Sequence, residues 1–251
     1  MVAQYSDLKD KVAIVTGAAR GIGKAIAVEL AAQGVRLMLD DLAERETLLS
    51  QTVDLITSSG GIATAVVADI RLEDNIKDLI AKTIATYGQI DILVNNAGIV
   101  YDIDWELKTE EQWKDTIATN LIGPYMLIRE ASSYLKQSKG SIINITSTNA
   151  YKAMSPLSLD YDASKAGLIT LTHNAAKALA PDVRVNAIAP GWVDTDMNSG
   201  LSNEIIKEET AKIFKTRFAR AEEIATIVSF LASSNASYIN GTTITADGGY
   251  Q

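Results

Sequence analysis

The chain has 251 residues, of which 47% are hydrophobic and 22% are charged, and its net charge at pH 7 is −8. This acidic balance disfavours nucleic acids and anionic membranes as partners, because both are negatively charged. Cysteine is absent and histidine occurs once, which excludes disulfides, thiol nucleophiles and thiolate metal sites, and we predict no metal centre.

The hydropathy of the chain predicts a cytoplasmic protein. Residues 1–11 lack the basic and apolar regions of a secretory signal. No run of about 18 or more apolar residues is present that could form a membrane span.

Strand-like and helix-like segments alternate along the chain. The predicted strands are residues 12–16, 36–40, 63–68, 92–95, 141–146, 184–188 and 242–245. The predicted helices are residues 21–33, 44–58, 72–87, 109–135, 162–179 and 221–231. The strands are apolar with little alternation, which is typical of strands buried on both faces. We therefore expect a single-domain α/β Rossmann fold over residues 1–251, a doubly wound seven-stranded parallel sheet with helices on both faces.

A glycine-rich turn follows the first predicted strand. Gly17, Gly21 and Gly23 have the spacing G-x-x-x-G-x-G, and a helix is predicted to open at about Gly21. Free N–H groups and the positive end of a helix dipole at such a turn suit a pyrophosphate. The motif alone is weak, since glycine turns after strands also serve plain packing.

Two aspartates end the second predicted strand. Asp41 stands eighteen positions after Gly23, where a carboxylate can accept both hydrogen bonds of an adenosine ribose diol. It would repel a 2′-phosphate, and Leu42 offers no countercharge, so NAD is favoured over NADP. Asp40 is the competing candidate, because strand alternation turns the two side chains in opposite directions. Arg20 argues the other way, since a guanidinium beside the turn can reach a 2′-phosphate.

Amide side chains follow the fourth predicted strand. The run Asn95-Asn96-Ala97-Gly98 permits close backbone approach to a flat ligand such as adenine. Asn120 falls inside the predicted helix of residues 109–135, where asparagine is unfavourable unless its side chain has a partner. We expect Asn120 to organise a water or a backbone carbonyl near Lys165; an exposed polar position is the alternative.

Tyr161 and Lys165 are placed at i and i+4 on the helix after the fifth predicted strand. An ammonium beside a phenol should draw the pKa of Tyr161 down from about 10, so that the phenol can exchange a proton with a carbonyl or an alcohol. Tyr5 and Lys9 have the same spacing, so location decides: Tyr161 follows Ser147, whose hydroxyl can hold a substrate oxygen. A serine hydrolase is disfavoured, because G-x-S-x-G is absent and His173 lies deep in this helix.

Residues 198–218 depart from the alternation and carry an extra helical pattern. Loops at the carboxyl ends of Rossmann strands border the ligand crevice. We expect this segment to be a mobile substrate lid; a plain surface helical hairpin is the alternative.

Taken in order, these motifs resemble the short-chain dehydrogenase/reductase family over essentially the whole chain. The matching motifs are residues 16–23, Asp69, residues 95–98, Asn120, Ser147, residues 161–165 and the run Pro190-Gly191-Trp192-Val193-Asp194-Thr195. The branch they look nearest to comprises 3-oxoacyl-carrier-protein reductases and sugar or polyol dehydrogenases.

The resemblance implies a catalytic tetrad of Asn120, Ser147, Tyr161 and Lys165. Tyr161 would be the acid/base, Ser147 would orient the substrate oxygen, Lys165 would bind the nicotinamide ribose and Asn120 would hold a relay water. The implied cofactor-binding residues are Gly17, Arg20, Gly21, Ile22, Gly23, Asp41, Asp69, Ile70, Asn96, Ala97, Gly98, Tyr161, Lys165, Pro190, Gly191, Val193 and Thr195. The expected substrate pocket contains Ser147, Met154, Leu159, Tyr161 and Trp192.

One departure from the family pattern concerns the loop before Tyr161. The stretch from Ser147 to Tyr161 is about one residue longer than usual and lacks a glycine soon after the serine. Thr146 or Thr148 could therefore contribute a hydroxyl, although Ser147 is kept as the predicted residue.

These features predict an NAD-linked oxidoreductase that acts on a secondary alcohol or ketone, such as a small hydroxy compound, a sugar or a polyol. A 3-oxoacyl-carrier-protein reductase is the leading alternative, although a chain of charge −8 is a poor partner for an acidic carrier protein. A non-catalytic NAD-binding sensor on the same fold is the alternative of another class. Besides a small-molecule substrate, the resemblance implies a homotetramer or homodimer.

Overall fold

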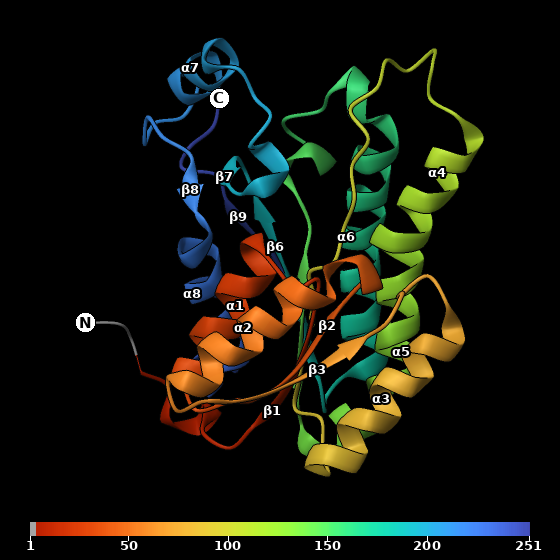
Figure 1. Cartoon of the computed structure of the whole chain (residues 1–251), viewed down its shortest axis with the longest axis vertical. Helices are drawn as coiled ribbons and strands as arrows, with labels where there is room; N and C mark the ends of the chain where they lie inside the picture. The colour runs from red at the N-terminus through yellow and green to blue at the C-terminus, as the bar shows by residue number, and fades with distance from the viewer. Residues whose placement is uncertain (1–3) are drawn as a thin grey trace.

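The computed structural model describes residues 4–251, and at its centre is a parallel sheet of seven strands (Figure 1). The strands, in the order β3-β2-β1-β4-β5-β6-β9, are β3 (Ile62–Val67), β2 (Arg36–Asp41), β1 (Val12–Thr16), β4 (Ile92–Asn95), β5 (Ser141–Ile145), β6 (Arg184–Pro190) and β9 (Thr243–Ala246). A short parallel pair, β7 (Val193–Asp194) with β8 (Ala219–Arg220), lies outside this sheet. The predicted fold class, a doubly wound Rossmann fold, is confirmed.

Helices cover both faces of the sheet. They are α1 (Gly21–Ala32), α2 (Glu46–Ser58), α3 (Glu73–Tyr87), α4 (Glu110–Ile117), α5 (Gly123–Ser138), α6 (Leu159–Leu179), α7 (Asn203–Ala211) and α8 (Ala221–Ala232). Helices α1, α2 and α8 pack on one face, and α3, α5 and α6 pack on the other (Figure 1). No helix within residues 4–251 is long and apolar enough to cross a bilayer.

Alternation along the buried strands produces two hydrophobic cores. Val15 and Leu39 join the core beneath α1, whereas Ile14 and Met38 join the core beneath α3. Successive strand residues point to opposite faces, so a strand covered on both sides must be apolar throughout. All five residues of β1 are accordingly buried.

The predicted helix of residues 109–135 is wrong as one continuous element. It consists of α4, a π-helical turn at Ala118–Ile122, and α5. The turn stands directly before Gly123 and Pro124; proline lacks the N–H that an α-helical ladder needs, and a Cβ at Gly123 would lie 2.8 Å from the carbonyl oxygen of Ile70. Close approach to Ile70, three residues after the end of β3, thus interrupts the helix where Asn120 is located.

Other boundaries differ by a few residues. Helix α6 begins at Leu159 rather than at residue 162, so Tyr161 lies in its first turn. Strand β2 extends to Asp41, because its pairing with β3 continues through Asp41 and Val67. Residues 43–45 form a separate 3-10 turn before α2.

The segment of residues 198–218 contains one helix rather than a hairpin of two. Helix α7 has no buried residue. After it, the N–H groups of Phe214 and Lys215 donate to the carbonyl oxygens of Gly249 and Gly248. The C-terminal residues therefore hold the far end of this segment, and both lie at the same end of the molecule (Figure 1).

The strand order reverses between β1 and β4. From β1 the chain builds outward through β2 and β3, and from β4 it builds outward on the other side. In open α/β sheets, ligands bind above the carboxyl ends of the strands at such a point. The glycine turn after β1 and the amide run after β4 are both located there.

Candidate active site

The turn after β1 is built for a group that approaches the backbone closely. Gly17 and Gly21 have φ angles of +66° and +56°, and a Cβ at Gly23 would overlap the carbonyl oxygen of Gly17. Helix α1 starts at Gly21 without a side-chain cap and without an acidic residue in its first turn, which contains Ile22. Its free N–H groups and positive dipole end suit a phosphate. The residues therefore fit the pyrophosphate of a dinucleotide.

Asn96 holds this turn against β4. Its side-chain amide donates to the carbonyl oxygens of Thr16 (2.8 Å) and Gly17 (3.1 Å). In return, the hydroxyl of Thr16 accepts the N–H groups of Asn96 and Ala97, both at 3.1 Å. A Cβ at Gly17 would lie 2.9 Å from the Cα of Ala97, so glycine is required for the approach. Thus Asn96 shapes the crevice through the backbone.

Asp40 and Asp41 do point in opposite directions. The carboxylate of Asp41 accepts the N–H groups of Ala19 (3.0 Å) and Leu42 (2.9 Å), and Arg45 lies 3.5 Å from it. This places Asp41 against the glycine turn. Asp40 is 1% exposed, and burial raises its pKa well above the usual value, with the nearby charge of Asp41 acting in the same direction.

Asp69 is engaged by a residue that sequence reasoning missed. The guanidinium of Arg71 contacts both carboxylate oxygens of Asp69, at 3.0 and 2.7 Å, and also reaches Asp115 on α4 at 2.9 Å. The hydrogen bond from Arg71 is the main cause that lowers the pKa of Asp69. Asp69 and Arg71 line a hollow between the ends of β2 and β3, and Ile70 is buried beside it.

Asn120 hydrogen-bonds both Ile99, which follows the run of residues 95–98, and Ser164 on α6. Its side-chain oxygen accepts the N–H of Ile99, while its amide donates to the Ile99 carbonyl, both at 2.9 Å, and to the hydroxyl of Ser164 at 3.0 Å. A Cβ at Gly98 would lie 3.3 Å from both Asn120 Oδ1 and Lys165 Nζ. The buried Asn120 thus has its partners near Lys165, and the exposed alternative is excluded.

Of the three candidate hydroxyls after β5, Ser147 is the one beside Tyr161. Thr146 donates to the Ile188 carbonyl at 2.8 Å, and Thr148 donates to the Pro190 carbonyl at 3.3 Å. The hydroxyl hydrogens of both threonines are therefore used in hydrogen bonds to the backbone of β6. Ser147 caps a short 3-10 turn by accepting the N–H of Asn149 at 3.1 Å, and its hydroxyl donates to Asn149 Oδ1 at 3.3 Å. Ser147 is also close enough to the Tyr161 phenol to oppose the rise of its pKa.

Electrostatics around Tyr161 reverse the predicted shift of its pKa. Burial raises the pKa to about 12; the hydrogen bond with Ser147 opposes this, and the charges of Asp162 and Asp102 add to it. Lys165 Nζ lies 5.5 Å from the centre of the Tyr161 ring and donates to the Ile145 carbonyl at 2.9 Å. Burial lowers the pKa of Lys165 to about 8. Desolvation therefore decides the direction of both shifts.

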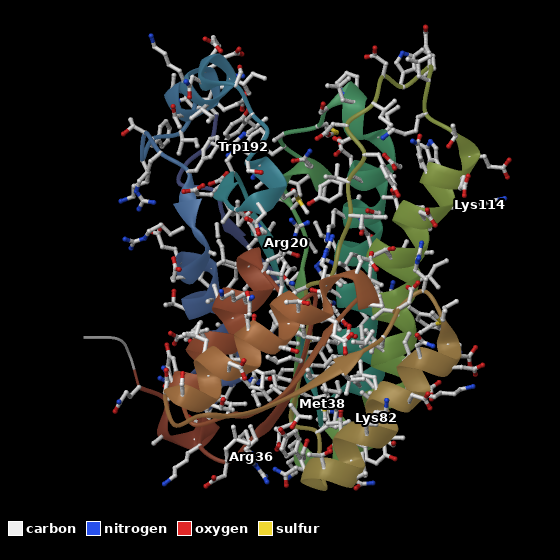
Figure 2. The ribbon with its side chains drawn as sticks, in the orientation of Figure 1. Arg20, Arg36, Met38, Lys82, Lys114 and Trp192 are labelled. Atoms are coloured by element: carbon white, nitrogen blue, oxygen red, sulfur yellow. The ribbon has the colours of Figure 1, made fainter. Side chains whose placement is uncertain are left out.

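The run from Pro190 to Thr195 lies across the start of α1. A Cβ at Gly191 would lie 2.9 Å from Asp247, and the side chain of Thr195 lies 3.6 Å from a Cβ placed on Gly21. Val193 is buried in β7. Figure 2 shows Trp192 below α7 and Arg20 at the start of α1, on the same side of the molecule. These residues therefore lie between the end of β6 and the start of α1.

Trp192 connects this crevice to α7. Its indole N–H donates to Glu209 Oε2 at 2.8 Å, and its ring stacks on Phe218 with 5.3 Å between the centroids. The hydroxyl of Tyr250 donates to the same oxygen of Glu209 at 2.7 Å. Glu209 therefore ties α7 to both Trp192 and the C-terminal residues.

The remaining predicted positions lie at the surface. Met154 is 68% exposed and Leu159 is 39% exposed, in and directly after the loop that precedes α6. His173 is exposed on α6. Arg71, Lys108 and Glu209 were not predicted, because Asp115, Asp160 and Trp192, which they contact, are distant in sequence. The position of Arg71, two residues after Asp69, and that of Lys212, three residues after Glu209, offered local signals.

A Rossmann sheet with a phosphate-shaped glycine turn, and with a serine, a tyrosine and a lysine beside one another at its carboxyl edge, defines a dinucleotide-dependent oxidoreductase. The family model described as Enoyl-(Acyl carrier protein) reductase matches residues 17–251. A 3-oxoacyl-(acyl-carrier-protein) reductase FabG of Staphylococcus aureus is 39% identical over 241 residues, which is 95% of this chain and 97% of the relative.

Solved structures agree with this similarity. A dehydrogenase/reductase from Sinorhizobium meliloti 1021 superposes with a TM-score of 0.92 at 35% identity, over 97% of both chains. A blue fluorescent protein from a metagenomic library, in complex with NADPH, has a TM-score of 0.91 at 31% identity, over 97% of this chain and 98% of that one. The chain belongs to the short-chain dehydrogenase/reductase family and is an oxidoreductase of that family.

Proposed function

We propose that this chain is an NAD-linked oxidoreductase that interconverts a secondary alcohol and a ketone of a small hydroxy compound, a sugar or a polyol. The observation that carries the proposal is the placement of Tyr161 between the Ser147 side chain and the Lys165 ammonium, above the carboxyl end of β5. The nicotinamide would supply or accept the hydride.

The side chains have complementary roles in this proposal. Ser147 holds the substrate oxygen and Tyr161 exchanges a proton with it. Lys165 offers its remaining N–H donors to a ribose, since one is used on Ile145. Asn120 keeps the backbone at Ile99 in place beside that ammonium. Val193, Thr195 and the glycine turn would hold the rest of the cofactor.

The proposed preference for NAD rests on Asp41. Its carboxylate is fixed by two backbone N–H groups at the end of β2, where a ribose diol can share it and a 2′-phosphate would be repelled. Arg45 and Arg20 are the opposing features, although Arg45 is already paired with Asp41. The NADPH seen in one structural relative makes NADP the alternative to test.

Reduction of 3-oxoacyl groups on a carrier protein is the second candidate, because the curated relative bears that name. Docking an acidic carrier needs unpaired basic residues near the cleft. Of the candidates Arg129, Lys136 and Lys177, Arg129 is paired with Glu73 and Glu130. Asp102 and Asp162 add negative charge next to Tyr161. Because these negative charges would repel an acidic carrier protein, they support a small substrate over a carrier-bound acyl group.

Initial rates with NAD(H) and NADP(H), over a panel of alcohols, sugars, polyols and acetoacetyl thioesters, test the proposal. We expect kcat/KM with NAD to exceed that with NADP by about tenfold or more, and the isosteric Asp41→Asn change to narrow the ratio by about tenfold. Turnover only with NADPH and an acyl thioester would establish the second candidate instead. Cofactor binding without any turnover, unaltered by Tyr161→Phe, would favour a non-catalytic sensor.

We also propose that the chain forms a homotetramer or homodimer. Trp113 on α4, Ile122 in the π turn and Tyr125 on α5 are 37%, 45% and 47% exposed, which leaves apolar surface on these helices uncovered in one chain.

A further inference from the structure

Lys108 and Asp160 form an ion pair whose two side chains are both 0% exposed. Lys108 lies in the loop before α4, and Asp160 is the residue before Tyr161 in the first turn of α6. Burying two charges costs desolvation that their attraction often does not recover, so such a pair is weak evidence for stability. The contacts of this pair indicate instead that it holds neighbouring loops and the start of α6 together.

Every donor of the Lys108 ammonium is used. Besides Asp160 Oδ1, Nζ donates to the carbonyl oxygens of Tyr101 (2.6 Å) and Leu157 (3.0 Å). An ammonium has three N–H donors, so none is left over. One side chain thus joins the loop after β4, the loop before α6 and the first turn of α6 at a single buried point.

The other carboxylate oxygen of Asp160 is also satisfied. The buried hydroxyl of Thr116, on α4, donates to Asp160 Oδ2 at 2.6 Å. Although burial alone would raise the pKa of Asp160, the hydrogen bonds from Lys108 and Thr116 hold it below the usual value. Asp160 is therefore a charged, fully bonded anchor for α4 as well.

A second aspartate completes the arrangement on the other side of Tyr161. Asp162 accepts the side-chain amide of Asn149 (3.0 Å), the N–H of Ser155 (2.9 Å) and the hydroxyl of Ser158 (3.0 Å). Asp162 therefore holds the loop of residues 149–158 directly, and Asp160 is linked to it through Lys108 and the Leu157 carbonyl. Displacement of this loop would displace Tyr161 relative to Ser147.

We propose that Lys108 is a positioning residue for the reaction: through Asp160 and the carbonyl groups of Tyr101 and Leu157, it fixes the first turn of α6 and the two loops beside it, so that the Tyr161 phenol meets the substrate oxygen. The inference rests on the proposed function. It goes beyond the Asn-Ser-Tyr-Lys set, because the side chains of those four residues make no described hydrogen bond or ion pair with Lys108 or Asp160. The contact with the set runs through the backbone, since the N–H of Tyr161 hydrogen-bonds the Asp160 carboxylate.

Thr116→Val tests the anchor with almost no change in shape. We expect kcat to fall about tenfold because the phenol is misplaced, with the Kd for the cofactor within twofold of wild type. Thr116→Ser keeps the hydroxyl and should restore kcat. Thr83→Val is the matched control, since Thr83 is equally buried on α3 and its hydroxyl donates to Leu79 at 2.7 Å. Equal losses in Thr116→Val and Thr83→Val would overturn the proposal.

The charge pair is tested with Lys108→Met and with Lys108→Met/Asp160→Asn. The single change leaves a buried unpaired carboxylate and should lower Tm, whereas the double change removes both charges and should recover much of that loss. We expect kcat/KM of the double variant to stay about tenfold or more below wild type. A double variant with wild-type kcat/KM would contradict the assignment.

Amide hydrogen exchange of residues 151–158 and 101–103 separates this inference from the proposed function. We expect exchange there to speed up about tenfold or more in the double variant and to be unchanged in Thr83→Val. Unchanged exchange in the double variant would overturn the inference whatever the activity. If the wild-type chain turns over no substrate, the proposed function fails, while the exchange rates still decide whether Lys108 holds the two loops.

Discussion

At the scale of single residues, the environment of Tyr161 sets its pKa, and through the pKa it sets how the rates of the two proposed directions of the reaction depend on pH. The phenol is desolvated and has two carboxylates near it, so its pKa is raised to about 12. In the proposed function, Tyr161 is then a neutral proton donor at neutral pH, which suits reduction of a ketone. Oxidation of an alcohol needs the phenolate, which burial disfavours.

The pH dependence of kcat/KM should therefore differ between the two directions. Because the raised pKa leaves little phenolate at neutral pH, we expect alcohol oxidation to accelerate as pH rises from 7 toward 10, by up to about tenfold per unit. Ketone reduction should not accelerate over that range. Tyr161→Phe should lower both rates by about 10²-fold or more, and a flat oxidation profile in wild type would contradict the assignment of Tyr161 as base.

Asp40 is a second buried acid with an unusual environment. Its Oδ1 has no hydrogen-bond partner among the described residues, and the charges of Asp41 and Asp69 lie nearby. Burial raises its pKa above that of the unfolded chain, so ionisation of Asp40 is less favourable in the folded state. The resulting loss of stability begins above the unfolded pKa of about 3.9 and grows until pH reaches the folded value.

We expect Asp40→Asn to stabilise the chain at neutral pH. The gain should be on the order of 1 kcal/mol, which raises Tm by about 2–4 °C, and it should shrink as pH is lowered toward 4. Thermal unfolding of both chains between pH 4 and pH 8 measures this. A variant that is less stable at every pH would mean that Asp40 makes a favourable interaction in its ionised form.

At the scale of elements, α7 depends on few contacts. None of its residues is buried, whereas Glu209 accepts hydrogen bonds from Trp192, Tyr250 and Lys212. The expectation that residues 198–218 form a lid remains a prediction, and Glu209 is the contact through which it can be tested. Loosening α7 should weaken substrate binding more than it slows the chemical step.

Glu209→Ala should raise KM for the substrate about three- to tenfold, with a smaller change in kcat. Glu208→Ala is the matched control, because Glu208 also pairs with Lys212, at 3.0 Å, but contacts neither Trp192 nor Tyr250 in any described hydrogen bond. Steady-state kinetics of both variants provide the comparison. Identical KM values in the two variants would show that Glu209 does not control a lid.

At the scale of the whole molecule, most apolar side chains of one chain are buried in the two cores beside the sheet. Apolar side chains of the α4–α5 region remain exposed. Trp113, Ile122 and Tyr125 are each more than a third exposed. Because apolar patches on a helix surface mark interaction sites, we expect the homo-oligomer to bury this region.

Light scattering on the purified chain should yield a mass of two or four chains. Changing Ile122 and Tyr125 together to lysine should shift the mass toward one chain, since charges in an apolar interface are costly to desolvate. Lysine at the exposed Leu55 of α2, which is 44% exposed, serves as the control and should leave the mass unchanged. A wild-type chain that is monomeric at every concentration would contradict the expectation.

The sequence by itself determined the sheet and predicted which candidate site residues lie at its carboxyl edge. Strands such as residues 12–16 and 92–95 were predicted with their observed bounds, because a strand buried on both faces is apolar along its whole length. Glycine positions were equally informative, since a positive φ or a missing Cβ leaves little choice of residue. Ser147, Tyr161 and Lys165 were predicted because the serine follows a strand end and the other two have a helical spacing.

Tertiary structure decided the rest, because the deciding contacts join residues far apart in the chain. Lys108 meets Asp160 across 52 positions, and Arg71 meets Asp115 across 44. Periodicity reports which face a residue occupies but not which distant residue lies opposite. The division of residues 109–135 and the raised pKa of Tyr161 have the same origin, since both depend on how closely separate elements approach one another.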